Sequence, residues 1–507
     1  MVTPIYATTA AILLLALCPS LALTHLALAW FPKERRPKNI VWIGRKSGLF
    51  SSFRACLSQW RYSPDLLEAG YRAFNRAGRA FLMPLFSFEP IVILPQEHIK
   101  WIIDQPPTVL CPRRAGSTRM GVRYVAKGFT QPTSDVLHAA IKVHLNRKFD
   151  SLQGEMYAQM SWAIDHSFGT GNCVSEIPLA KALRYTVYHT LVPVLAGGEL
   201  AKNEGFVDAI ISSSEWFGAS STVVGQCLPP PLRGPIGWVL QKPIRYIQQR
   251  YLRYLMPIVR ERLHRLQSNI EVPQDMVTWL CQVILKSPVV EDREQVFAEA
   301  FNLLLGSAFT STVLTAHHTL LDVLGSSSKD EIYQTLREEA VSTFDNVEKW
   351  SSPSAVLALH RTDSTLRESL RRAPPTSMAL LREVIPRDGL TLPNGQFLNK
   401  GAWLAVPSIP IHNDSRFYDH PDEFQPFRFM RGDKPESCVS TNDTFLSFGH
   451  GRSACAGRQL ATCILKMIIA YIVVHYDIEA IDGRPPNFFM GEHAVPPDVV
   501  VRIRRRV

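Results

Sequence analysis

The sequence predicts a mainly α-helical protein with a smaller β portion, preceded by one N-terminal transmembrane helix. Three observations support this prediction. The N-terminal segment is apolar and uncharged, the middle of the chain carries long apolar segments with helical periodicity, and glycine and proline separate short apolar runs in the C-terminal half. Hydrophobic residues make up 46% of the chain and charged residues 20%, which excludes wholesale disorder.

The N-terminal segment predicts the compartment. Residues Met1 to Pro32 contain no Asp, Glu, Lys or Arg, and Ala7 to Trp30 is mostly Ala, Leu and Ile. As a helix this stretch is about 36 Å long, enough to cross a bilayer core of about 30 Å. A basic cluster follows it and none precedes it, so the positive-inside rule places the rest of the chain in the cytosol. A cleaved signal peptide is the alternative, but it normally has a charged start and a shorter apolar core.

These observations divide the chain into three parts. We expect a transmembrane anchor over residues 1–32, a basic, proline-containing linker over 33–39 and one catalytic domain over 40–507. The formal net charge is +10, yet no nucleic-acid recognition motif accompanies the basic residues, so we expect no nucleic-acid partner. The nine cysteines are odd in number and form no CxxC pair, which favours reduced thiols in the cytosol.

The sequence of the catalytic part predicts helices followed by a β-rich region. Apolar runs, start signals and prolines indicate each element. The expected elements are a strand over Ile91–Leu94, helices over Ser134–Leu152, Glu291–Leu324 and Asp363–Arg372, hairpins over Leu380–Pro407 and a helix over Gln459–Val474. We also expect a membrane-dipping loop from Leu228 to Leu240.

One cysteine stands in a setting that suits ligand chemistry. Cys455 lies in a glycine-rich loop just before a long apolar helix. A helix N-terminus and its free N–H groups favour a thiolate, so we expect a lowered thiol pKa there. Glycines let the backbone approach a flat ligand closely, Phe448 can pack near the sulfur, and Arg452 can pair with an acidic group. A thiolate held in this way can be the fifth ligand of haem iron.

The loop Ser447-Phe448-Gly449-His450-Gly451-Arg452-Ser453-Ala454-Cys455-Ala456-Gly457 resembles the haem-binding loop of the cytochrome P450 family, whose pattern is Phe-x-x-Gly-x-Arg-x-Cys-x-Gly. Arg452 is taken for the arginine of that pattern. Two further elements agree with the resemblance. Glu368 and Arg371 match the family's Glu-x-x-Arg helix, and Arg428 stands in a Pro-x-Arg-Phe element that would complete a Glu–Arg–Arg cluster. The likeness is greatest to filamentous-fungal members of natural-product biosynthesis.

The resemblance implies the P450 fold and haem b with the Cys455 thiolate as axial ligand. It implies insertion of one oxygen atom from O₂ into a lipophilic small molecule, such as a terpenoid or related secondary metabolite. Electrons would come from NADPH through NADPH–cytochrome P450 reductase. The expected location is the endoplasmic reticulum membrane, with membrane lipid around the anchor and the catalytic domain in the cytosol.

The resemblance also assigns roles to individual residues. Thr310 is the expected distal hydroxyl; Phe309 stands where an acid is common, and an alignment with Thr312 is the alternative. Arg452, Arg382 and Lys142 or His138 are expected at the haem propionates. The candidate pocket residues are Ala308, Phe309, Ser377 and Met378.

Three other functions stay open at this point. One is a haem-thiolate isomerase or dehydratase that acts on peroxides without a reductase. Another is a non-enzymatic haem-binding protein. The last is a membrane-tethered helical scaffold without haem. A requirement for NADPH and reductase separates the first of these from a monooxygenase, and a haem chromophore excludes the scaffold.

Overall fold

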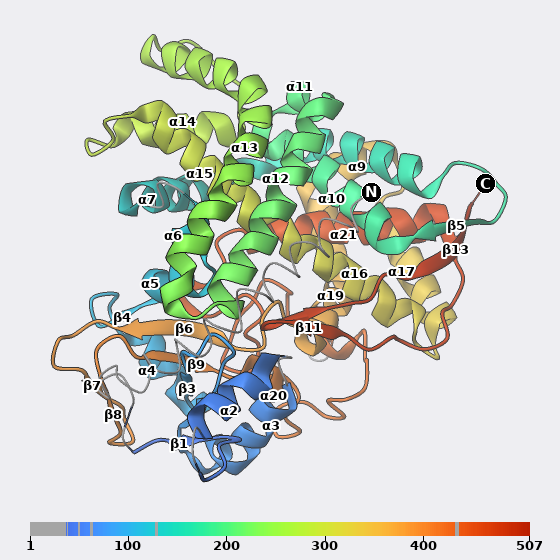
Figure 1. Cartoon of the computed structure of the whole chain (residues 1–507). Helices are drawn as coiled ribbons and strands as arrows, with labels where there is room; N and C mark the ends of the chain where they lie inside the picture. The colour runs from blue at the N-terminus through green and yellow to red at the C-terminus, as the bar shows by residue number, and fades with distance from the viewer. Residues whose placement is uncertain are drawn as a thin grey trace.

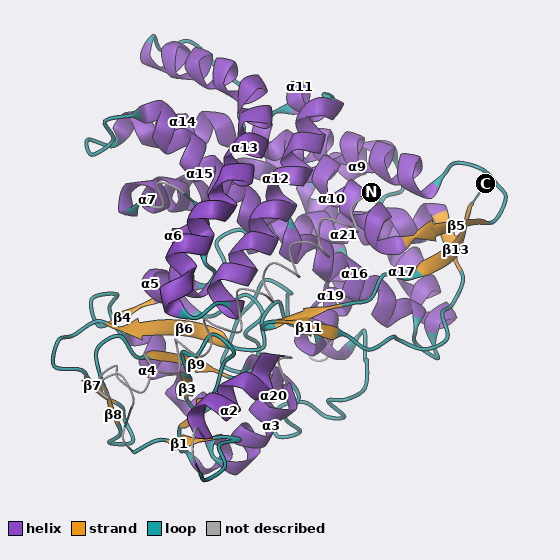
Figure 2. Cartoon of the chain, viewed as in Figure 1, coloured by secondary structure: helices purple, strands orange, loops and turns teal. Residues whose placement is uncertain are grey.

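The computed structural model describes residues 37, 39–48, 51–60, 64–126, 130–430 and 435–506. The expected anchor over 1–32 and most of the expected linker over 33–39 lie outside the described residues. Helices dominate the described part, and the larger sheet occupies the lower left of the view in Figure 1. Figure 2 shows the same division by secondary structure. The prediction of a mainly helical fold with a smaller β portion is confirmed.

The helices between residues 51 and 286 include two long ones, α12 and α13, that lie side by side. Their bounds are α2 (Ser51–Leu57), α3 (Pro64–Ala73), α4 (Ile99–Asp104), α5 (Pro112–Arg119), α6 (Val122–Val125), α7 (Gln131–Ala139), α8 (Asn146–Lys148), α9 (Gln153–Phe168), α10 (Leu179–Ala196), α11 (Gly198–Ala201), α12 (Glu204–Thr222), α13 (Pro230–Gln267) and α14 (Met276–Lys286).

The remaining helices follow α14 in the chain. They are α15 (Arg293–Ala308), α16 (Thr310–Leu324), α17 (Lys329–Thr343), α18 (Pro353–Ala358), α19 (His360–Arg372), α20 (Ser408–His412) and α21 (Arg458–His475). The α15–α16 pair and α21 are long and apolar enough to cross a membrane by composition, among the described residues. Both pack into the main hydrophobic core, since α16 and α21 are buried over most of their length.

The expected helix over Glu291–Leu324 is interrupted at Phe309. Asp292 caps α15 by accepting a hydrogen bond from the N–H of Gln295 at 3.0 Å. At the break, Phe309 is fully buried and its ring stacks on Tyr188 of α10, with ring centroids 4.0 Å apart. Beside it, the Thr312 hydroxyl donates to the carbonyl of Ala308 at 2.8 Å. Such back-bonding by hydroxyl side chains bends helices, which accounts for a local interruption at this point.

Two other expected elements differ from the structure. The helix expected over Ser134–Leu152 begins at Gln131, because the Thr130 hydroxyl accepts a hydrogen bond from the N–H of Thr133. It then passes through a π-helical turn, Ala140–Leu145, and ends in a 3₁₀ turn. The segment expected as a loop from Leu228 to Leu240 is helical from Pro230 onward, where proline suits the first helical position.

The strands form four sheets. Their bounds are β1 (Val41–Trp42), β2 (Phe81–Met83), β3 (Ile91–Ile93), β4 (Leu110–Cys111), β5 (Ser175–Pro178), β6 (Ala379–Val384), β7 (Leu390–Thr391), β8 (Phe397–Leu398), β9 (Trp403–Val406), β10 (Tyr476–Ile478), β11 (Phe488–Met490), β12 (His493–Val495) and β13 (Val500–Arg505). The largest sheet has the order β1-β2-β3-β9-β6-β4, and β7-β8 and β11-β12 are two-stranded hairpins. The expected strand at Ile91 and the expected hairpins are thus confirmed.

The third sheet has the order β10-β13-β5, so the last strand of the chain is its central one. Ile503 pairs with Ile478 on one side and Ser175 on the other. The arginines of this strand and of the residue after it meet acidic partners on neighbouring elements. Arg502 pairs with Glu479 at 2.9 Å, Arg506 with Asp477 at 3.2 Å, Arg504 with Asp477 at 3.5 Å, and Arg505 pairs with Asp165. Each arginine of the basic C-terminal cluster therefore has an acidic partner, although Arg504 and Arg506 share Asp477.

Candidate active site

The cysteine loop folds back on itself before α21. The N–H of Cys455 donates to the carbonyl of Phe448 at 2.7 Å, and the N–H of Gly449 donates to Leu446 at 2.8 Å. Gly449 and Gly451 both have positive φ, 66° and 69°, which disfavours any residue with a Cβ. A Cβ at Gly451 would also lie 2.9 Å from the Cβ of Ile103 on α4. The sequence therefore needs glycine at Gly451 for two separate reasons.

Cys455 is exposed to solvent, although protein atoms also surround its thiol. Burial raises the pKa of the Cys455 thiol, while backbone N–H groups of Gly457 and Arg458 and the charge of Arg458 oppose this rise. The net pKa is raised, so the expected lowering is wrong for the metal-free protein because desolvation is the larger effect. A coordinating metal ion deprotonates a thiol outright, so binding of iron would set the thiolate state.

Arg382 is a buried cation next to this loop. It lies on β6, is 6% exposed, and donates to the Ser453 hydroxyl at 2.5 Å and to the Leu381 carbonyl at 3.0 Å. Among the described residues no carboxylate forms an ion pair with it. Burial lowers its pKa to about 10. A buried guanidinium needs a compensating anion, so this arginine is available to an anionic ligand group.

The arginine of the P450 pattern needs a correction. With Phe448, Gly451, Cys455 and Gly457 in register, the pattern's arginine falls two residues before the cysteine, where this chain has Ser453. Arg452 stands one residue earlier and is exposed. The Ser453 hydroxyl instead accepts the hydrogen bond from Arg382, which places a cation from β6 at that part of the loop.

The expected contacts from the α7 region are not made in the described structure. Lys142 lies in the π-helical turn after α7, and both it and His138 are exposed. Neither forms a hydrogen bond or ion pair with the cysteine loop within the described residues. Their role at a propionate stays a prediction.

The helix α16 starts with an open, hydroxyl-bearing face. Ser307, Thr310 and Ser311 are exposed, although the helix on either side is largely buried. The neighbouring helix α12 crosses here at close range. A Cβ at Gly306 would overlap the ring of Phe217, and a Cβ at Gly218 would lie 3.8 Å from the Thr310 hydroxyl oxygen. Thr310 is thus exposed but lies at the edge that borders α12.

The alternative Thr312 and the expected pocket residues lie elsewhere around this helix. Thr312 is buried and its hydroxyl donates its proton to the carbonyl of Ala308. Ala308 is half-buried, and Phe309 points into the core against Tyr188. Ser377 is fully buried, and Met378 packs in a small core with Phe81 and Trp403.

Glu368, Arg371 and Arg428 form one buried cluster, as the spacing and the resemblance predict. Arg371 donates to the two carboxylate oxygens of Glu368 at 2.8 and 2.9 Å, and Arg428 donates to Glu368 at 3.0 Å. Arg371 also donates to the carbonyls of His412 and Pro421 at 2.7 Å each. Every charge therefore has several partners, which is the condition for burying charge without a large penalty.

Sequence reasoning missed two buried residues that support the cysteine loop. Arg367 is fully buried beside Glu368, donates to the carbonyls of Ser437 and Ser440 at 2.8 Å each, and lies 3.9 Å over the ring of Phe445. His412 is fully buried and contacts both α19 and the start of the loop. A sequence signal for His412 is its place directly before Asn413 and Asp414.

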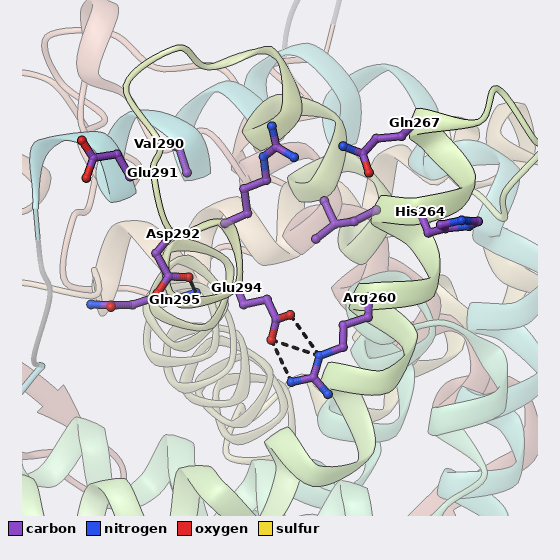
Figure 3. A pocket seen from close by; sticks show the side chains of 10 residues that line it. Arg260, His264, Gln267, Val290, Glu291, Asp292, Glu294 and Gln295 are labelled. Carbon is purple, nitrogen blue, oxygen red and sulfur yellow. Dashed lines mark hydrogen bonds and ion pairs between the residues drawn. The ribbon is translucent and has the colours of Figure 1, made fainter.

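A separate hollow on the surface carries no catalytic arrangement. It lies between the C-terminal part of α13 and the start of α15, as Figure 3 shows. Arg260 and Glu294 face each other across it in an exposed ion pair at 2.8 Å. Within the described residues no group of three or more His, Cys, Asp or Glu side chains could hold a metal ion. The cysteine loop is therefore the candidate site.

The fold and the site together define a helical protein that presents one cysteine at the start of an apolar helix, behind a buried Glu–Arg–Arg cluster. A family model described as Cytochrome P450 matches residues 163–502. The chain belongs to the cytochrome P450 family, and its enzyme class is that of a P450 monooxygenase.

Curated relatives cover nearly the whole chain. It is 32% identical to cytochrome P450 monooxygenase polB of Polytolypa hystricis, over 93% of this chain and 94% of that protein. It is 30% identical to cytochrome P450 monooxygenase nodZ of Hypoxylon pulicicidum, over 94% and 93%. It is 28% identical to cytochrome P450 monooxygenase lnaC of Aspergillus flavus, over 94% of each.

The family implies a haem-thiolate cofactor, and the residues present fit one. Cys455 offers an accessible sulfur at a helix N-terminus, and Gly457 leaves open space where a side chain would stand. Arg382 offers a buried positive charge that no carboxylate of the described residues neutralises. A flat, anionic macrocycle with a central metal meets each of these requirements.

Proposed function

We propose that this protein is a membrane-anchored haem-thiolate monooxygenase that inserts one oxygen atom from O₂ into a lipophilic small molecule. The observation that carries the proposal is the joint placement of an accessible Cys455 thiol and a buried Arg382 beside the same loop. Haem b held by a thiolate supplies the activation of O₂. The protein's residues hold the group, orient the substrate, exclude water and deliver protons.

In this proposal Cys455 is the axial ligand, and the loop backbone fixes its position. The N–H of Cys455 donates to the carbonyl of Phe448, which fixes the backbone of the loop at the residue that carries the sulfur. Arg382 would neutralise a propionate, and its hydrogen bond to the Ser453 hydroxyl holds the guanidinium beside the loop. Arg452 and Lys142 are exposed and would have to move inward to contribute, which makes them secondary candidates.

Protons reach the site along the open face of α16. Thr310 and Ser311 both expose hydroxyl groups there, and Phe309 occupies the position where an acid is common in the family. A hydroxyl can hold a water molecule and pass a proton through it. Thr310 is the proposed residue, and Ser311 is its neighbour on the same open face.

We further propose that the substrate is a terpenoid or related fungal secondary metabolite. Support comes from the resemblance to natural-product enzymes and from the fungal origin of the relatives above. Electrons would come from NADPH through NADPH–cytochrome P450 reductase. The proposed location is the endoplasmic reticulum membrane, which rests on the apolar residues 1–32 and the basic residues after them.

The test is the carbon-monoxide difference spectrum of the reduced full-length protein. We expect a red-shifted, thiolate-type Soret band that Cys455→Ala abolishes. Cys173→Ala is the matched control, since Cys173 is also an exposed free cysteine and should leave the band intact. An imidazole-type band, or an unchanged band in Cys455→Ala, would refute the assignment.

The substrate and electron source need separate measurements. We expect apolar terpenoids to shift the haem Soret band and small polar acids not to, because the site's segments are mainly apolar. Product formation should require NADPH and reductase. Turnover of a peroxide without either would favour the isomerase or dehydratase instead, and a shift with polar acids alone would overturn the lipophilic substrate.

A further inference from the structure

The start of α16 is fixed to the helix α10 by one pair of aromatic rings. Phe309 is the N-cap residue of α16, and its carbonyl accepts the N–H of Val313 at 2.9 Å. Its ring is fully buried and lies on the ring of Tyr188, with centroids 4.0 Å apart and an interplanar angle of 5°. Tyr188 is 2% exposed, within a stretch of α10 that is buried from Thr186 to Ala196. The stack therefore joins the first turn of α16 to the buried part of α10.

The position of the Phe309 ring sets the directions of the residues that follow it. Successive residues of an α-helix point about 100° apart around the helix axis. With the Phe309 ring in the core, Thr310 points about 100° away and Ser311 about 200° away, so both turn from the core. Thr312 comes back to within about 60° of Phe309. The observed burial agrees, since Thr310 and Ser311 are exposed whereas Thr312 is 4% exposed.

A second set of contacts holds the end of α15 beside this stack. In an unbroken helix the carbonyl of Leu305 would accept the N–H of Phe309. Here it accepts the hydroxyl of Ser214 on α12 at 3.2 Å. Burial raises the pKa of Tyr188, and a hydrogen bond with Ser214 opposes that rise, so the Tyr188 hydroxyl stays protonated next to Ser214. Three helices, α10, α12 and α15, thus meet at the break through Tyr188, Ser214 and Leu305.

Packing, rather than charge, orients the hydroxyl groups at this break. Phe309 stands where an acid is common in the family, and its ring can neither hold nor move a proton. A buried acid would need charged or hydrogen-bonded partners. The aromatic pair needs none, and it leaves proton transfer to the exposed hydroxyls of Thr310 and Ser311.

We propose that Tyr188 is a positioning residue for the proposed oxygenation: its ring holds Phe309, which aims the hydroxyls of Thr310 and Ser311 at the open face of α16. The inference rests on the proposed function, because the direction of these hydroxyls affects the reaction only where a proton has to be delivered. Loss of the stack frees Phe309 to turn, so the first turn of α16 rotates and both hydroxyls change direction. Tyr188 itself touches no reacting atom.

The experiment uses full-length, haem-loaded ferric protein and cumene hydroperoxide, a probe that needs neither reductase nor knowledge of the substrate. If the O–O bond breaks heterolytically, the leaving oxygen takes a proton that the site delivers, and the product is cumyl alcohol. If the bond breaks homolytically, no proton is needed, and the alkoxyl radical loses a methyl radical to give acetophenone. The ratio of the two products, measured by chromatography, therefore reports proton delivery.

Three variants separate the stack from other effects. Tyr188→Leu removes the stacked ring, and we expect the ratio of cumyl alcohol to acetophenone to fall by roughly fivefold. Tyr188→Phe keeps the ring without the hydroxyl and should retain the wild-type ratio. Tyr157→Leu is the matched control, because it removes a tyrosine that stacks on Trp350 elsewhere in the core, with ring centroids 5.2 Å apart. It should lower the free energy of unfolding without changing the product ratio.

Hydrogen exchange gives a readout that does not depend on haem. The N–H of Val313 is bonded to the Phe309 carbonyl in the wild type, so it should exchange faster in Tyr188→Leu and not in Tyr157→Leu. If Tyr188→Leu does not fold, Ser214→Ala takes its place, because it removes the hydroxyl bonded to Leu305 without opening a large cavity. We expect Ser214→Ala to act in the same direction by a smaller factor.

Two kinds of result would overturn the inference. One is an unchanged product ratio in folded Tyr188→Leu, or in Ser214→Ala where it takes the place of that variant. The other is an equal fall in Tyr157→Leu or in Tyr188→Phe, which would assign the effect to general instability or to the hydroxyl. Absence of the thiolate-type band in the wild type would instead overturn the proposed function. Unchanged exchange at Val313 would then overturn the stack as well.

Discussion

Nε2 of His412 accepts the backbone N–H of Leu446 at 2.8 Å, at the point where the cysteine loop begins. The other ring nitrogen, Nδ1, donates to the carbonyl of Arg371 at 2.9 Å. One neutral imidazole therefore bridges the helix of the Glu–Arg–Arg cluster and the loop that presents Cys455. Burial lowers the pKa of His412 to about 3, which keeps it in the neutral form that this bridge requires.

This bridge predicts acid sensitivity. The folded-state pKa of His412 lies below its ordinary value of 6.5, and the same holds for His318, also at about 3. The unfolded chain binds protons that the folded chain excludes, so this stability is complete above pH 6.5 and decreases as pH falls toward 3. Each such histidine adds a slope of about 1.4 kcal/mol per pH unit in that window.

Denaturant unfolding measured between pH 4 and pH 7.5 checks this expectation. His412→Asn should reduce the slope by about one proton. Equal slopes in wild type and His412→Asn would contradict the neutral-bridge assignment.

Arg382 predicts effects of opposite sign on the apoprotein and the holoprotein. Arg382→Met removes a buried cation that no described carboxylate balances, so the apoprotein should gain stability. The same change removes a charged hydrogen-bond donor to a propionate, worth about 1.5–3 kcal/mol, so haem should dissociate faster. Urea unfolding of the apoprotein and haem transfer to apomyoglobin measure the two quantities.

The exposed Arg387, a few residues further along the chain, provides the control for this prediction. Arg387→Met should change neither measurement. If Arg382→Met left haem dissociation unchanged, the propionate contact would have to be assigned to another cation, such as Arg452 or Lys142.

The Glu368 cluster predicts a large loss of stability on truncation. Arg371→Met leaves the buried carboxylate with one arginine fewer and several carbonyls without a donor, which should cost about 3–5 kcal/mol. Thermal unfolding and haem content per protein measure this loss. Arg184→Met, which breaks an exposed ion pair with Glu215, should change little. A comparable loss of stability in both variants would contradict the expectation that the buried cluster stabilises the fold more than an exposed ion pair does.

The open face of α16 predicts different outcomes for two neighbouring hydroxyls. Thr310→Ala should lower product formed per NADPH oxidised by roughly tenfold, with the electrons lost to peroxide, if Thr310 delivers protons. Ser311→Ala is the matched comparison, because Ser311 is exposed on the same face. A larger effect for Ser311→Ala would transfer the role to Ser311, since Thr310 borders α12.

Local signals made part of the site predictable. The spacing of Glu368 and Arg371 on one helix face and the glycines around Cys455 are properties of short segments, so the sequence alone indicated them. The break at Phe309 was not predictable, because it depends on stacking against Tyr188, which is more than a hundred residues away along the chain. The contact of Arg382 with Ser453 and the pairing of Arg119 with Glu492 likewise depend on tertiary structure.

The pKa of the Cys455 thiol shows a different limit of prediction from the sequence. The backbone N–H groups beside Cys455 were predictable from the sequence pattern, and those of Gly457 and Arg458 do act to lower the pKa of the thiol. The opposing effect, desolvation, depends on how closely the rest of the fold surrounds the sulfur, and it is the larger of the two. A sequence pattern contains the first effect and not the second.

The β10-β13-β5 sheet has a consequence for biosynthesis. Its central strand, β13, is translated after both of its neighbours, and β5 emerges before most of the helical core exists. The edges of β5 and β10 that face β13 therefore stay unpaired until β13 has been made. Formation of this sheet thus depends on a strand that follows the cysteine loop and α21 in the chain.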